Sequence, residues 1–405
     1  MKKFFLILSL LLGVFIFLNV IYANDIFKFG DADADGEISA SDAAQIMQKV
    51  LVETHKTPLE SKTEKPFKYL DVTADGNIAA DDAAAVLQKT LVETYKMPCE
   101  TKGDDNIEKA VRKKNILQTG DTTDVPNEYL TVSDKPGKVV KIEYDTEDYY
   151  RNERDITKTA YVYLPYGYNE NEQYDIFYFM HGWTGTADEF FTIMNGSIKN
   201  MADHMIENDD IPPTIFVAAT FDADNAPQDF GTSVGELRQF HLDFKNALMP
   251  AVESKYSTYA KSVSDEDLKV SRAHRAFGGF SLGSVTTWNE FVYNYDYIGY
   301  FLPMSGACWY YGGYGDYYPV ETCDYFEDMI NKNDLNERGY FIYAATGTRD
   351  AVLDQVEIQM SEMLDRKDFF TDEHLVYYMK QGGVHDMVAV REYIYNALPV
   401  FFGGE

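Results

Sequence analysis

A Gly-x-Ser-x-Gly pentapeptide at residues 279–283 constrains the fold of this chain more than any other feature. It follows an apolar run at 275–279 and precedes a helix-like segment at 284–293. A strand, a sharp turn and a helix in this order expose the central serine, and small flanking residues let the strand and helix backbones approach closely. We therefore expect Ser281 to be a nucleophile at the carboxyl end of a strand.

A serine hydroxyl is a weak nucleophile unless a base accepts its proton and a carboxylate orients that base. Two histidines, His374 and His385, follow Ser281 in the chain. His385 lies on a glycine-rich loop after the strand-like run 375–379, whereas His374 precedes that run and belongs at the opposite edge of a sheet. The sequence therefore favours His385 as the base.

The carboxylate should come from a loop between the serine and the base. Asp350 closes a short loop after the strand-like run 340–345 and is the preferred acid. Asp354 is an alternative one helical turn further on, and Asp386 is too close to His385 in sequence to orient it easily. Asp350 could also serve only as the cap of the following helix.

Two backbone N–H groups are needed to stabilise the oxyanion of an ester-cleaving serine. One is expected from Leu282, the residue after the nucleophile, and the other from the loop after an earlier strand. The run 176–180 has the character of that strand, so we expect the second donor to be Trp183. His181, in the same loop, is expected to be structural.

Strand-like and helix-like segments alternate along the carboxyl-terminal part of the chain. Two opening strands are expected at 138–144 and 160–164, and further strands begin near residues 176, 214, 274, 300, 340 and 375. Helix-length segments separate the later ones, which predicts an α/β fold with a doubly wound sheet. In such a sheet the functional loops lie at the carboxyl ends of the strands.

Three segments, 277–309, 250–260 and 344–347, resemble the feruloyl esterase domains of carbohydrate esterase family 1, in particular those of clostridial multidomain xylanases. The resemblance places an α/β-hydrolase domain at 127–405 and implies hydrolysis of ferulate or p-coumarate esters on arabinoxylan. It puts Ser281, Asp350 and His385 at the family's triad positions. Ser284 stands where many family members have a glycine, a small and tolerable change. The residues around His385 differ from the aromatic-rich version of the family, which leaves the substrate preference more open than the catalytic mechanism.

An aromatic, glycine-rich loop at 308–318 is expected on the catalytic side of the sheet. Trp309 could stack there against a feruloyl ring or a sugar, or the loop could simply pack over the domain. Cys308 and Cys323 flank this loop, and in an exported protein they could form a disulfide or remain two thiols. Cys99, the third cysteine, is expected to be free.

The amino-terminal part contains a repeat at an offset of 40 residues, and each copy opens with an acidic loop that resembles an EF-hand. Such loops hold calcium through oxygen ligands around a turn glycine. The first loop offers Asp31, Asp33, Asp35, the Glu37 carbonyl, Ser39 and Asp42, and the second offers Asp71, Thr73, Asp75, the Asn77 carbonyl and Asp82. Because Ala79 carries no ligand, the second site is expected to bind calcium more weakly.

This duplicated loop and helix resembles a type I dockerin, a small all-α module, over residues 27–100. The resemblance implies calcium as a structural ion and a cohesin domain of a scaffoldin as partner. By the same analogy, the cohesin is selected by Ala40 and Ser41 in the first copy and by Ala80 and Asp81 in the second. The alternative is a solvated acidic face that binds no metal.

Basic residues followed by the apolar run 4–21 indicate a secretory signal peptide at 1–23, although an uncleaved anchor is an alternative. The polar segment 101–126 has the composition of a linker. A net charge of −30 argues against binding to nucleic acid. The sequence thus predicts a secreted protein of two modules that does not stay in the membrane after signal cleavage.

Three functions fit this organisation. The first is a secreted feruloyl esterase that docks into a cellulosome, with feruloylated xylan as substrate and no cofactor for catalysis. The second is an acetyl xylan esterase with the same triad. The third is an inactive carbohydrate-binding module on a dockerin, and the presence of all three triad residue types argues against it.

Overall fold

The computed structural model describes residues 123–151, 154–310 and 318–403, together with residues 32, 42–46, 70 and 86. The chain divides into two compact units, residues 1–116 and 117–405. In the first unit, residues 42–46 are helical. The predicted signal peptide at 1–23 and most of the predicted linker at 101–126 lie outside the described residues.

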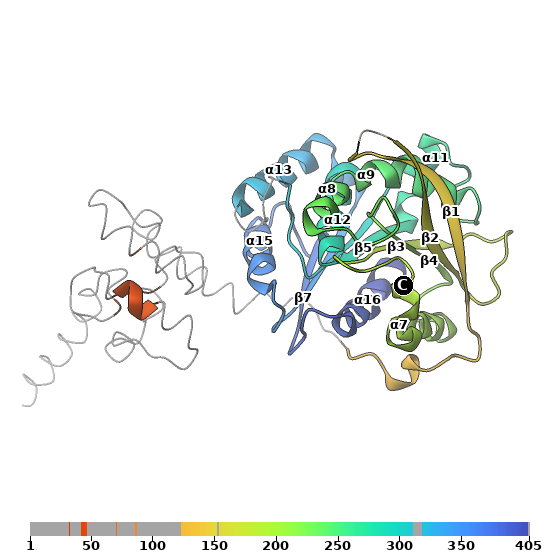
Figure 1. The fold of residues 1–405 in the computed structure, drawn as a ribbon, viewed down its shortest axis with the longest axis horizontal. Coiled ribbons are helices and arrows are strands. Elements are labelled where there is room, and N and C mark those ends of the chain that lie inside the picture. The colour runs from red at the N-terminus through yellow and green to blue at the C-terminus, as the bar shows by residue number, and fades with distance from the viewer. Residues whose placement is uncertain are drawn as a thin grey trace, which may run out of the picture. The chain divides into compact units, whose positions relative to one another are not determined.

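The second unit is built on an eight-stranded sheet with the strand order β1-β2-β4-β3-β5-β6-β7-β8 (Figure 1). The first two strands, β1 (Lys138–Asp148) and β2 (Arg154–Leu164), form an antiparallel hairpin, and β2 pairs antiparallel with β4. All other neighbours are parallel; the strands are β3 (Asp175–Met180), β4 (Thr214–Ala219), β5 (Arg275–Phe280), β6 (Tyr300–Met304), β7 (Phe341–Gly347) and β8 (Leu375–Lys380).

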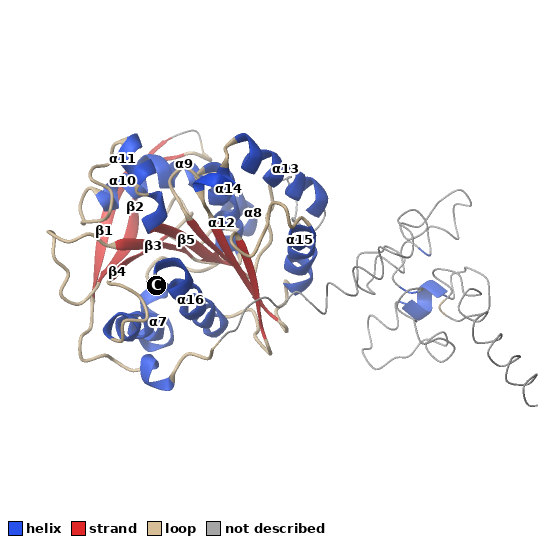
Figure 2. Ribbon diagram, turned by 180° about the vertical axis from the view of Figure 1, so that it is seen from behind, coloured by secondary structure: helices blue, strands red, loops and turns tan. Residues whose placement is uncertain are grey.

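Helices cover both faces of this sheet (Figure 2). On one face lie α7 (Glu189–Glu207) and α16 (Met387–Phe402), which contact each other. The other face carries α8 (Phe230–Leu237), α9 (Phe240–Asp243), the π-helical turn η3 (Phe244–Leu248), α10 (Met249–Glu253), α11 (Asp265–Val270), α12 (Leu282–Tyr293), α13 (Pro319–Lys332), α14 (Leu335–Arg338) and α15 (Leu353–Asp365). Two short 3₁₀ turns, η2 (Asn127–Leu130) and η4 (Arg272–His274), complete the described elements.

The burial of the strands follows from these layers. Every residue of β3, β4 and β5 is buried, as expected for parallel strands with helices on both faces. In β1, the carboxyl-terminal half alternates between exposed and buried residues, because only one face of the hairpin meets the core. Two apolar clusters, one on each face of the sheet, form the core.

The predicted doubly wound fold is confirmed, and the strand order explains where a site can form. From β3 the chain moves to β4 on one side and later to β5 on the other, so the order reverses between β3 and β5. Ligands of open α/β sheets bind outside the carboxyl ends of the strands at such a reversal. Ser281 follows β5 and Trp183 follows β3, so both lie at this point.

The opening hairpin is longer than predicted: the sequence indicates strands at 138–144 and 160–164, but the strands extend to Asp148 and begin at Arg154. The added ends contain charged and polar residues, which hide the apolar alternation that identifies a strand. Among the helices that the structure describes, none is both long and apolar enough to span a bilayer.

Candidate active site

Ser281 occupies the tight turn between β5 and α12, as the pentapeptide predicts. Its backbone has φ 58° and ψ −116°, a conformation that is rare for a residue with a side chain. Glycine is required on both sides: a Cβ on Gly279 would lie 2.3 Å from the Gly283 carbonyl oxygen, and one on Gly283 would lie 2.1 Å from the Met180 carbonyl oxygen. The strand, the helix and the β3 loop therefore meet at backbone contact around the serine.

Asp350 and His385 are brought together by the loops that follow β7 and β8. Nδ1 of His385 donates a hydrogen bond of 2.8 Å to Oδ1 of Asp350. The two loops are locked by close backbone contact, since a Cβ on Gly347 would lie 2.3 Å from the Gly383 carbonyl oxygen. The His385 ring lies 4.4 Å, centroid to centroid, from the ring of Phe280, the residue before Ser281. The imidazole therefore lies beside the serine turn.

The electrostatics of this pair suit a base held by a carboxylate. Burial of Asp350 acts to raise the pKa of its carboxyl, but hydrogen bonds from His385 and from the Val352 N–H outweigh this, so the pKa lies below its usual value. The side chain is therefore a carboxylate at neutral pH. It fixes the His385 proton on Nδ1, which leaves Nε2 to accept another.

The alternatives for the acid and base have other places in the structure. Asp354 is exposed in the first turn of α15, and Asp386 caps α16 by accepting from the Val388 and Ala389 N–H groups. His374 precedes β8 and bonds the Tyr340 carbonyl oxygen at the opposite end of the sheet from Ser281. A capping contact of Asp350 is compatible with its predicted role as the acid. Its Oδ1 accepts a hydrogen bond from the Val352 N–H as well as from His385.

The two predicted oxyanion donors belong to backbone segments next to the serine. Leu282 is the first residue of α12, where an N–H has no acceptor within the helix. Gly182 packs against the nucleophile, since a Cβ there would lie 3.1 Å from the Ser281 Cβ. The following residue is Trp183, whose N–H makes no backbone hydrogen bond in the part of the chain that is described. His181 is buried, and burial lowers its pKa to about 4, so its ring is neutral.

Three aromatic side chains form a row that begins with Trp183, in the loop that packs against Ser281. Trp183 is 46% exposed, and its ring meets that of Phe230 edge to face at a centroid distance of 5.2 Å. Trp309 is half-buried and lies 6.4 Å from Phe230. Sequence reasoning missed Phe230. This residue is the first of α8 and follows the capping residue Asp229, and there its ring contacts Trp183. A single exposed aromatic residue carries no sequence signal of its own.

Cys308 and Cys323 are free thiols and are fully buried. Of the two alternatives that the sequence allows, a disulfide or two thiols, the structure has the thiols. Burial raises the pKa of Cys308 to about 12, so this thiol stays protonated and unreactive. Both side chains belong to the apolar cluster that also contains Trp288 and Phe326. Cys99 lies outside the described residues.

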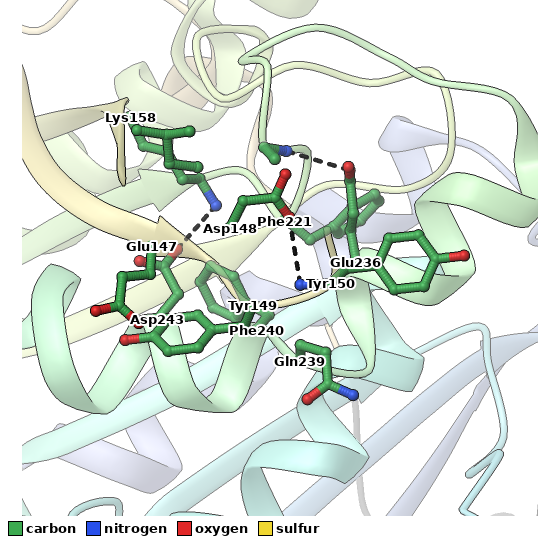
Figure 3. Close-up of a pocket in the computed structure, with 12 residues that line it drawn as sticks. Glu147, Asp148, Tyr149, Tyr150, Lys158, Phe221, Glu236, Gln239, Phe240 and Asp243 are labelled. Carbon is green, nitrogen blue, oxygen red and sulfur yellow. Dashed lines mark hydrogen bonds and ion pairs between the residues drawn. The ribbon is translucent and has the colours of Figure 1, made fainter. Parts of the chain in front are cut away.

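A small pocket opens near the end of the β1–β2 hairpin (Figure 3). Lys158 bonds Asp243 at 2.8 Å, and Glu236 accepts from the Ala223 N–H at 3.1 Å. The pocket has a volume of about 20 Å³, and Ser281 does not line it. Because a cavity for one water molecule needs about 10–15 Å³, the pocket is too small for an ester substrate.

The predicted calcium ligands and cohesin-binding residues lie outside the described residues, with one exception. Asp42 is fully buried in the helical segment 42–46. Over the ranges that the structure does describe, no group of three or more His, Cys, Asp or Glu side chains is arranged to hold a metal ion.

An eight-stranded, largely parallel sheet with a serine turn after β5 and an Asp–His pair on the loops after β7 and β8 defines an α/β-hydrolase. The chain belongs to the esterase family described as "Putative esterase", whose model matches residues 153–361. A type I dockerin domain model matches residues 29–91. The chain is therefore a carboxylic ester hydrolase with an amino-terminal dockerin module, and the resemblance to both families is confirmed.

Two curated relatives are much longer than the region that they share with this chain. The chain is 35% identical over 282 residues to endo-1,4-beta-xylanase Y of Acetivibrio thermocellus, which covers 68% of this chain and 24% of the relative. It is 27% identical over 175 residues to an endo-1,4-beta-xylanase/feruloyl esterase of Xylanibacter ruminicola, which covers 41% of this chain and 21% of the relative. The matched regions thus span about a quarter or less of these relatives.

Two solved structures share the fold. The feruloyl esterase module from Clostridium thermocellum, a serine-to-alanine mutant complexed with sinapinate, has 34% identity and a TM-score of 0.60, covering 71% of this chain and 95% of that one. A ferulic acid esterase from the anaerobic fungus Anaeromyces mucronatus has 20% identity and a TM-score of 0.52, covering 71% and 98%. The fungal enzyme supports the fold alone.

Proposed function

We propose that this chain is a secreted serine esterase that releases ferulate or p-coumarate from arabinoxylan within a cellulosome. The observation that carries the proposal is the Asp350–His385 hydrogen bond beside the Ser281 turn, in a domain that covers 95% of a feruloyl esterase module at 34% identity. That module was solved with sinapinate, a hydroxycinnamate like ferulate. The same class of aromatic acid is therefore the proposed acyl group.

In the proposed mechanism, the Ser281 hydroxyl attacks the ester carbonyl while His385 Nε2 accepts its proton. The negative charge that forms on the carbonyl oxygen is stabilised by the N–H groups of Trp183 and Leu282. Collapse of this intermediate breaks the bond to the sugar oxygen, which leaves with the proton from His385. A water molecule, deprotonated by the same imidazole, then releases the acid from the serine. Asp350 stabilises the imidazolium in both halves.

The aromatic row supports an aromatic substrate. Trp183 lies in the loop that packs against Ser281, and Phe230 and Trp309 continue the row from it. Flat apolar side chains of this kind stack on a phenolic ring or on a sugar face. We propose Trp309 as the substrate contact within this row. Acetate, in contrast, has no ring to stack, so an acetyl ester can gain from the row only through its sugar, whereas a feruloyl ester can also gain through its acyl group.

The amino-terminal module is proposed to carry the enzyme into a multienzyme complex. A dockerin match at 29–91 supports calcium binding by the two acidic loops and a cohesin domain as partner. Export through the signal peptide at 1–23 is part of the same proposal, because a cellulosome is extracellular. Ala40, Ser41, Ala80 and Asp81 are the proposed cohesin contacts.

One assay tests the enzymatic part of the proposal. Wild-type protein and Ser281→Ala are compared on methyl ferulate and on acetylated xylan, with ferulate and acetate measured separately. The proposal expects wild-type protein to release ferulate with a kcat/KM at least tenfold above that for acetate, and Ser281→Ala to release neither. Release of acetate alone would establish the acetyl xylan esterase instead.

A further inference from the structure

The peptide between Gly182 and Trp183 is held by the side chain that precedes it. His181 Nδ1 lies 2.8 Å from the Gly182 carbonyl oxygen, which also accepts from the Gly185 N–H at 3.1 Å. This carbonyl and the Trp183 N–H belong to one peptide unit. Because the peptide is trans, the two groups point in opposite directions. Fixing the carbonyl toward the His181 ring therefore fixes the direction of the Trp183 N–H.

The hydrogen bonds around His181 define one tautomer of its neutral ring. A carbonyl oxygen can only accept, so the proton lies on Nδ1 and Nε2 is left as an acceptor. Thr220 Oγ1 lies 2.7 Å from Nε2 and donates to it, while accepting from the Asp222 N–H at 3.1 Å. Thr220 thus holds the ring in the form that can bind the Gly182 carbonyl.

This arrangement is buried in the interior of the domain. His181, Thr220 and Asp222 are all buried, and the His181 ring packs against Phe221 at a centroid distance of 4.8 Å. Asp222 in turn accepts from the Ser233 hydroxyl at 3.1 Å, which ties the loop after β4 to helix α8. The direction of the Gly182–Trp183 peptide is therefore set by three segments rather than by its own loop alone.

We propose that His181, held by Thr220, is a positioning residue that aims the Trp183 N–H at the oxyanion. The inference rests on the proposed function, in which Trp183 supplies one of two oxyanion donors. An oxyanion donor acts on charge that develops only in the transition state. Loss of the positioning contact should therefore lower kcat and leave KM nearly unchanged.

The test compares two substitutions of His181. His181→Phe keeps a planar ring but removes the donor to Gly182, whereas His181→Asn retains a donor near the position of Nδ1. We expect kcat on methyl ferulate to fall about tenfold to a hundredfold in His181→Phe, with KM within twofold, since loss of one oxyanion donor costs about 10²–10³. His181→Asn should recover a substantial part of the loss.

A matched control is available in His241. Its Nδ1 also bonds a backbone carbonyl, that of Arg238 at 3.0 Å, its ring stacks on Tyr293, and burial lowers its pKa to about 4 as well. His241→Phe should therefore cost comparable stability, measured by thermal unfolding, while kcat and KM stay unchanged. This separates a positioning role from a general structural one.

The outcomes decide the inference. A folded His181→Phe variant with kcat within threefold of wild type overturns it, and so does a kcat loss equal to that of His241→Phe. If His181→Phe does not fold, Thr220→Val takes its place, because it removes the donor to Nε2, along with the acceptor of the Asp222 N–H, and leaves the His181 ring intact. An unchanged kcat in that variant also overturns the inference. If wild-type protein has no esterase activity on methyl ferulate, the proposed function fails, whatever the variants do.

Discussion

His385 Nδ1 and Asp350 Oδ1 lie 2.8 Å apart, although 35 residues separate them in the chain. Their contact follows from the sheet: β7 and β8 are parallel neighbours, so the loops at their carboxyl ends meet. The Arg349 N–H donates to the Gly383 carbonyl oxygen at 2.9 Å and joins these loops directly. The orientation of the proposed base therefore depends on backbone contacts as much as on the carboxylate.

Asp350→Asn tests the role of that carboxylate. An amide has nearly the same shape, but its NH₂ cannot accept the Nδ1 proton and its oxygen cannot stabilise an imidazolium by charge. We expect kcat on methyl ferulate to fall by about 10³–10⁴ with little change in thermal unfolding temperature. Exposed Asp354 provides the control, and Asp354→Asn should retain full activity. A reversed pattern would transfer the role of acid to Asp354.

Glu290 makes the stability of the hydrolase unit depend on pH. It is fully buried in α12, and burial, opposed by a hydrogen bond from Asn294, raises its pKa to about 8. A pKa raised above the unfolded value near 4.5 contributes stability at low pH that is lost as pH rises toward 8. Between these values the loss is on the order of 1.4 kcal/mol per pH unit.

Glu290→Gln removes this ionisation, so its free energy of unfolding should fall less than that of the wild type between pH 5 and pH 8. Urea unfolding at three pH values measures the difference, and Glu266→Gln, at an exposed position of α11, is the control that should follow the wild type. Parallel curves for wild type and Glu290→Gln would contradict the assignment.

Gly283→Ala tests the close packing at the serine turn. The new methyl group would overlap the backbone oxygens of Met180 and His181, at 2.1 and 2.7 Å, and neither can move without shifting β3 or its loop. We expect a loss on the order of 3 kcal/mol in the free energy of unfolding, together with loss of activity. Gly231→Ala, in α8, would place its Cβ 3.4 Å from a side-chain oxygen of Asp229, an ordinary contact, and should leave the free energy of unfolding nearly unchanged. Equal costs would show that the turn tolerates a side chain.

Calcium removal should affect the dockerin module and leave the activity of the esterase module unchanged. The carboxylates of Asp31, Asp33, Asp35 and Asp42 would repel one another in a compact loop without a cation, so metal binding and folding should be coupled. We expect EGTA to abolish cohesin pull-down and to unfold the isolated segment 27–100 by circular dichroism, while the rate on methyl ferulate stays nearly constant. Cohesin binding that is unchanged by EGTA would contradict the proposal that calcium is required for this partner.

The residues that sequence reasoning located are those whose position follows from strand order. Ser281, Asp350 and His385 each follow a strand that could be recognised from its apolar run, and carboxyl ends of parallel strands meet at one edge. The same argument predicts His374 at the opposite edge, and its bond to Tyr340, the residue before β7, agrees with this.

Contacts between side chains on different loops could not be predicted from strand order. His181 and Thr220 meet because β3 and β4 are neighbours in the sheet and both side chains turn inward just after their strands end. Phe230 reaches Trp183 because α8 begins at that point. Neither contact leaves a periodic pattern in the sequence, since each depends on the path of a loop rather than on the period of a strand or helix.

The most direct test of the account is to identify the residue that an active-site phosphonate ester modifies. A serine nucleophile with a neighbouring base and oxyanion donors reacts covalently with such a reagent, so peptide mass spectrometry can locate the adduct. We predict one adduct per chain, on Ser281, with loss of methyl ferulate hydrolysis in proportion to labelling and no adduct in Ser281→Ala. Stoichiometric labelling at another residue, or full hydrolysis after Ser281 is completely labelled, would contradict the account.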